Sequence, residues 1–142
     1  MRFRRPDLLD VLLVFGSFAL FTVPVLIRGS GHGPAAAVVA VGTAAAVPLL
    51  ARRAAPVPVL VTVSLVLVVA ALTDIRFTPF ISNAGPALGL AVLTVADRLP
   101  RAGSLRVSAL AVGLVTVAEL TALQVHPGTG QDAIQLVLAV PA

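Results

Sequence analysis

The sequence predicts an all-α protein, a polytopic transmembrane helical bundle with five complete spans plus a partial or truncated sixth. Of the 142 residues, 58% are apolar and only 11% are charged, and the mean hydropathy is +1.06, far above that of soluble domains. Long uncharged runs divide the chain, and residues 54–73 form one such run. Because crossing a hydrocarbon core of about 30 Å takes about 20 apolar helical residues, lipid accounts for these runs.

Each of the first four expected spans is built on one uncharged run. We expect these spans at about residues 8–27, 33–51, 54–73 and 77–96. A cleaved signal peptide is an alternative for the first, but no small-x-small cleavage site with a soluble mature domain follows it. In the third span, valine occupies every second position from 57 to 63, as in a strand. Helix is favoured there, because Pro58 would break a strand ladder and Leu60 is not polar.

The fifth span is expected at about residues 105–125, with Glu119 as the only charge between Val107 and Val125. A last apolar run, residues 133–142, is too short to cross, since ten helical residues reach only about 15 Å. It either lies along the outer surface or begins a sixth helix of a longer protein. The second interpretation is favoured, because a carboxylate ending in hydrocarbon would be costly. All six segments form one domain, residues 1–142.

Arginine supplies every basic side chain, and its distribution predicts the orientation. With the N-terminus inside, eight arginines face the cytoplasm and two, Arg28 and Arg76, face outward, as the positive-inside rule requires. We therefore expect a multi-pass protein of the cell membrane. Five of the eight are candidate contacts for anionic lipid headgroups: Arg52, Arg53, Arg98, Arg101 and Arg106.

Two polar residues are expected within the bilayer. Glu119 lies six residues before the outer end of the fifth span, and Asn83 lies six residues after the outer start of the fourth, so their depths match and they are a candidate hydrogen-bonded pair. Snorkelling of Glu119 to the outer interface is the alternative. The fourth span also contains Pro86 and a GxxxG spacing, Gly85 to Gly89, which allows close helix packing.

Several classes of site are excluded or disfavoured. The absence of cysteine excludes disulfides and thiolate sites, and there is no Walker loop, HExxH or GxSxG motif. His32 and His126 are weak zinc ligands without nearby carboxylates, so we expect no metal and no cofactor. The arginines lack interleaved aromatic residues, so nucleic acid is not an expected partner.

Three stretches, "RRPDLLDVLLVF", "ARRAAPVPVLVTV" and "ADRLPRAGSLRVSALAVGLV", resemble the membrane-embedded N-terminal sensor region of bacterial two-component sensor histidine kinases of the high-GC type. The resemblance covers nearly all of the chain. It implies a homodimeric membrane bundle followed by a kinase that acts on a response regulator. The family's phosphoacceptor, in a Glu-Leu-His-Asp context, and its ATP-binding motifs are not in this chain, so no catalytic residue is carried over.

Two functions follow as hypotheses. The first is a sensor and anchor module that transmits a membrane or envelope signal to a cytoplasmic kinase domain, so that the chain alone is not an enzyme. The alternative is a small transporter-like or permease-associated membrane protein, for which interrupted helices and intramembrane polar groups are expected.

Overall fold

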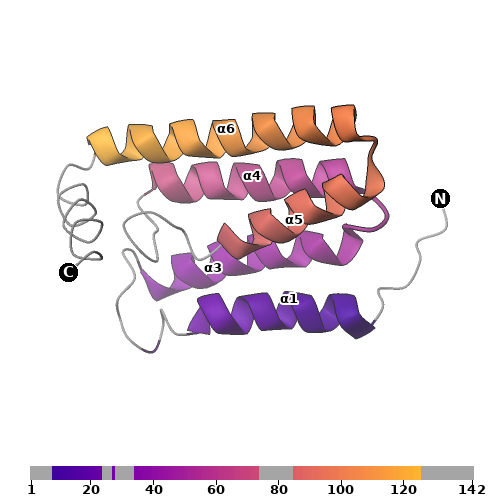
Figure 1. Ribbon diagram of the computed structural model, residues 1–142. Helices are drawn as coiled ribbons and strands as arrows, with labels where there is room; N and C mark the ends of the chain where they lie inside the picture. Colours follow the sequence, from indigo (N-terminus) through magenta and orange to yellow (C-terminus); the bar gives the residue numbers. More distant parts are fainter. Residues whose placement is uncertain (1–7, 24–26, 28–33, 74–84, 126–142) are drawn as a thin grey trace, which may run out of the picture.

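The structure is a computed structural model that describes residues 8–23, 27, 34–73 and 85–125. The described elements are helical throughout and run alternately up and down the bundle (Figure 1). They are α1 (Leu8–Phe21), α3 (Ala35–Ala46), the 3-10 helix η1 (Val47–Ala51), α4 (Pro56–Leu72), α5 (Gly85–Arg98) and α6 (Arg101–Val125).

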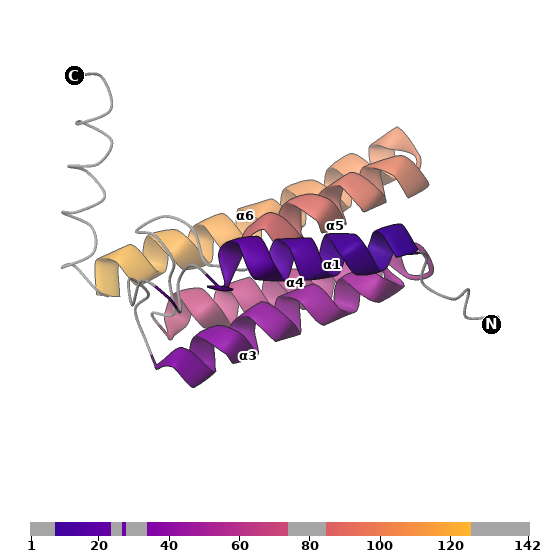
Figure 2. The ribbon, with the colours of Figure 1, turned by 90° about the horizontal axis from the view of Figure 1, so that it is seen from below.

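Helix α4 is the centre of the bundle, because it packs against α3, α5 and α6. Helix α1 lies on the far side of α3 and also contacts η1 and α5, whereas α6 forms the opposite edge (Figures 1 and 2). This arrangement brings the start of α1, the turn between η1 and α4, and the turn between α5 and α6 to one end of the bundle. We call this the arginine end, because Arg52, Arg53, Arg98 and Arg101 lie in or beside these segments.

Prolines set several helix boundaries. Pro48 lies at the start of η1, where an α-helix would need the N–H group that proline lacks, and α3 ends just before it at Ala46. Helix α4 begins at Pro56, and Pro86 lies in the first turn of α5, where an N–H would have no helical partner. Pro100 separates α5 from α6. Over its described residues, α5 is continuous from Gly85 to Arg98, with Pro86 in the first described turn.

The prediction of five complete spans plus a partial sixth is wrong. Among the described residues, only α6 contains a segment long and apolar enough to cross a membrane, the 22 residues Arg101–Ala122. The other α-helices have 12 to 17 residues. The physical reason is that an uncharged run gives an upper limit on helix length, while proline and glycine begin and end helices inside it. Residues 133–142, the expected sixth segment, lie outside the described residues.

Small side chains fill the interior of the described bundle. Its buried apolar residues comprise eight alanines, six valines and only three leucines, Leu49, Leu60 and Leu67. Eleven leucines are instead exposed, among them Leu8, Leu110 and Leu105, whose exposed fractions are 77%, 75% and 69%. The bundle thus packs through small residues and presents its large aliphatic side chains outward.

Candidate functional site

A buried acid organises the arginine end. Asp10, in the first turn of α1, is 2% exposed, and its Oδ1 accepts hydrogen bonds from Nε of Arg52 at 3.1 Å and from Nη2 of Arg52 at 2.6 Å. Its Oδ2 lies 3.1 Å from Nε of Arg53. The helix start also favours the negative charge, because its free N–H groups carry partial positive charge. Asp10 therefore fastens α1 to the turn before α4.

Exposure separates the two arginines into different roles. The side chain of Arg52 is 11% exposed, so its charge is committed to Asp10. The side chain of Arg53 is 39% exposed and retains a surface that can meet an external anion.

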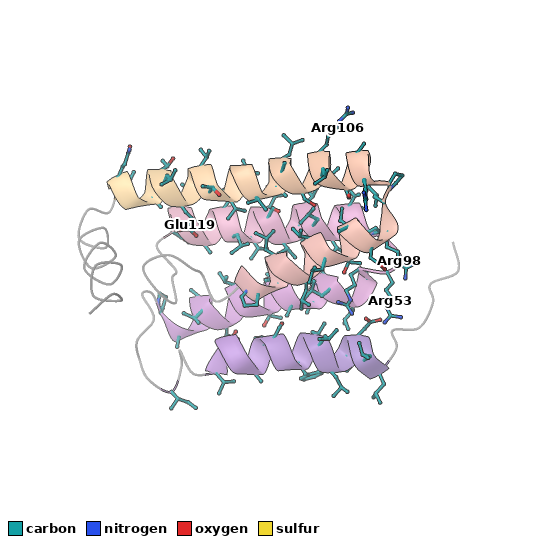
Figure 3. All side chains as sticks on the ribbon, viewed as in Figure 1. Arg53, Arg98, Arg106 and Glu119 are labelled. Carbon is teal, nitrogen blue, oxygen red and sulfur yellow. The ribbon has the colours of Figure 1, made fainter. Side chains whose placement is uncertain are left out.

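The remaining three predicted arginines are all exposed. Arg98 ends α5, with its Nε 3.8 Å from the exposed carboxylate of Asp97, while Arg101 and Arg106 lie in the first two turns of α6. Figure 3 places Arg53 and Arg98 at the same end of the bundle and shows Arg106 pointing away from it. Arg52, Arg53, Arg98 and Arg101 against Asp10 and Asp97 give the described part of this end a net charge of +2. It can bind phosphate or carboxylate groups.

Only one member of the predicted polar pair, Glu119, lies among the residues that the structure describes. Glu119 is half-buried on α6, toward the end of the bundle opposite the arginines (Figure 3). It is engaged in an interaction of its own, so it is not an isolated charge. Asn83 lies outside the described residues, and the pair stays a prediction.

An open apolar groove of about 400 Å³ runs between α1 and α5. Leucines from both helices line it, together with Gly16, Gly89 and Pro86, and Ser17 is its one hydroxyl-bearing residue. Gly89 faces this space and has no atom within 4 Å of the position where a Cβ would stand. The close helix packing expected for it from the GxxxG spacing is therefore absent at this position.

No group of three or more potential metal-ligating side chains occurs among the described residues. His32 and His126 lie outside them.

Comparison with known proteins places the chain in a family. The model of a domain of unknown function (DUF7134) matches residues 1–142, the whole sequence. The chain belongs to this family. No curated protein and no solved structure matches the chain. Membership in DUF7134 assigns no activity, so the resemblance to sensor histidine kinases remains a hypothesis.

Sequence reasoning missed two features of this DUF7134 domain. One is Asp10, which was not among the predicted site residues, although an acid at the edge of an apolar run in a chain with an arginine pair is a detectable pattern. The other is the groove, which has no sequence pattern because it depends on how α1 and α5 pack in space.

Proposed function

We propose that this chain is the membrane-embedded sensor and anchor module of a two-component histidine kinase. The observation that carries the membrane part is the outward placement of large aliphatic side chains around an alanine- and valine-rich interior. Membrane bundles pack in this way, because lipid solvates leucine and small residues let helices approach closely. In water the same surface would be a large exposed apolar patch.

Helix α6 supports this proposal independently. A long apolar helix can also be the core of a soluble protein, but only 17% of the most apolar window of α6 is buried. A signal sequence would lie near the N-terminus, whereas this segment begins at Arg101. The proposal assigns a full crossing to α6 and places the shorter helices beside it in the apolar layer.

The hydroxyl groups are consistent with an apolar surrounding. Six of them bond the carbonyl four residues earlier in their own helix. Four of these, on Thr62, Thr73, Thr116 and Thr121, belong to exposed residues, at distances of 2.9, 2.7, 2.8 and 2.8 Å. Such bonds leave no donor that requires water.

Membrane association is tested by expressing the chain in bacteria and extracting the membranes with alkaline carbonate. We expect the protein to stay in the membrane pellet and to be released only by detergent. Release by carbonate alone would contradict the membrane assignment.

The kinase assignment rests on the sequence resemblance and has a separate test, the reading frame that follows Ala142. We expect it to encode a phosphoacceptor histidine in a Glu-Leu-His-Asp context and an ATP-binding domain, and the full protein to autophosphorylate. A full-length protein that lacks these motifs would contradict this part. For the transporter alternative, which expects interrupted helices, α5 is continuous over its described residues Gly85–Arg98.

A further inference from the structure

The groove between α1 and α5 is large enough to bind a small ligand. Its volume of about 400 Å³ lies within the usual range of small-molecule sites, which is roughly 300 to 1,000 Å³. A Cβ at Gly16 or at Gly89 would meet no atom within 4 Å, so both glycines border open space. The lining is apolar apart from Ser17, which suits a hydrocarbon chain.

One end of the groove leads to the arginine end. On α5, Arg98 follows the lining residue Leu93 by five positions, about 8 Å along the helix axis. On α1, the lining residue Leu12 is two positions after Asp10, whose Oδ2 holds Arg53. At that end of the bundle the side chains of Arg98 and Arg53 are 46% and 39% exposed, and each already faces a carboxylate, Asp97 or Asp10, so a phosphate would share these guanidinium groups with the acids.

We propose that this groove binds one anionic membrane phospholipid, with an acyl chain along α1 and α5 and its phosphate at Arg98 and Arg53. The apolar lining matches the chain and the net positive end matches the headgroup. A guanidinium can bind two phosphate oxygens at once. A zwitterionic lipid also carries a phosphate, but its own ammonium group lies beside that phosphate and competes with the guanidinium for it. The proposal rests on the membrane part of the proposed function and adds a specific lipid site to it.

The experiment is native mass spectrometry of the full chain in detergent with added phosphatidylglycerol or phosphatidylcholine. We expect one phosphatidylglycerol to be retained per chain, with a preference over phosphatidylcholine of about tenfold, as an additional hydrogen bond to a charged group would give. Equal retention of the two lipids would overturn the proposal.

Matched glycine variants test the groove itself. Gly89→Leu fills the groove, whereas Gly113→Leu adds the same atoms on α6, where a Cβ likewise meets nothing within 4 Å. We expect Gly89→Leu to lose the retained lipid and Gly113→Leu to keep it. Equal lipid retention in the two variants would overturn the site.

Matched arginine variants test the headgroup contact. Arg98→Gln should abolish most of the preference for phosphatidylglycerol, whereas Arg106→Gln, whose side chain points away from the bundle, should keep it (Figure 3). An equal loss in both would indicate a diffuse charge effect and overturn the assignment of Arg98.

Tryptophan fluorescence gives a second measurement in bilayers, because the chain has neither Trp nor Tyr. Brominated phosphatidylglycerol should quench Leu93→Trp at lower mole fraction than brominated phosphatidylcholine does, and should show no such difference at Leu110→Trp on α6. If carbonate releases the chain from membranes, the proposed membrane function and this lipid site are both refuted. If the chain stays in the membrane and binds both lipids equally, only this lipid site is refuted.

Discussion

Asp10 shows how one residue can hold two elements of this bundle together. Its two carboxylate oxygens are engaged by different arginines, and both arginines lie more than 40 positions away in the sequence. A buried ion pair adds little net stability compared with apolar residues of the same shape, but removing one partner leaves the other charge stranded. The pair therefore sets where α1 docks.

The first prediction is that Asp10→Asn destabilises the chain by about 3 kcal/mol, because it strands the guanidinium of Arg52, which is only 11% exposed. The measurement is thermal or denaturant unfolding in detergent. Asp97→Asn is the control: its carboxylate is 82% exposed and pairs with the neighbouring Arg98, so we expect almost no change. Equal effects of the two substitutions would show that the Asp10 cluster does not hold α1.

The second prediction separates the two arginines that share Asp10. Arg52→Gln should destabilise the chain more than Arg53→Gln, because Arg52 makes two hydrogen bonds to Oδ1 and is more buried than Arg53. The same unfolding measurement decides the order. A larger loss for Arg53→Gln would reverse the roles assigned here.

The third prediction concerns Glu119 and Asn83 and rests on the proposed kinase. In the full-length protein, Glu119→Gln and Asn83→Leu should each change basal autophosphorylation about threefold, the population shift that a membrane hydrogen bond of about 0.6 kcal/mol gives. Expression should not change, and the double mutant should be non-additive if the residues touch. Strictly additive effects would leave Glu119 as a residue that reaches the interface.

At the scale of elements, α4 shows what the helix interfaces require. It contacts three other α-helices, and its buried face carries Ala70 and Ala71 beside Val63 and Leu67. Small side chains at these positions let the neighbouring backbones approach, and a larger one has no free volume to occupy.

The fourth prediction is that Ala70→Leu destabilises the bundle by about 1 to 3 kcal/mol through overpacking, because Ala70 is fully buried. Val69→Leu is the matched control on the same helix, since Val69 is 56% exposed and the added carbon would lie on the outside of the bundle. Unfolding in detergent measures both. A tolerated Ala70→Leu would mean that the interior of the bundle is loosely packed.

At the scale of the whole molecule, charge and apolar surface are separated. The described arginines gather at one end of the bundle, while large aliphatic side chains cover its flanks (Figure 3). In a bacterial membrane the positive-inside rule would hold that end in the cytoplasm.

The fifth prediction is the orientation. Alkaline phosphatase fused after Arg98, before the crossing assigned to α6, should be inactive, and the same enzyme fused after Val125, at the end of α6, should be active, because the enzyme works only outside the cytoplasm. A fluorescent protein that matures in the cytoplasm should give the opposite pattern at each position. Activity after Arg98 and silence after Val125 would reverse the orientation.

The sequence by itself determined the helical class, since uncharged runs broken by proline and arginine exclude an amphipathic strand pattern. It also pointed to five arginines that the structure places at the ends of helices or in the turns between them. It overestimated the helix lengths and with them the number of complete spans, because the absence of charge does not show where proline ends a helix. Only the tertiary structure paired Asp10 with Arg52 and opened the groove beside Gly89. Helices that are apolar on every face carry no pattern that says which face meets which, so these contacts depend on packing alone.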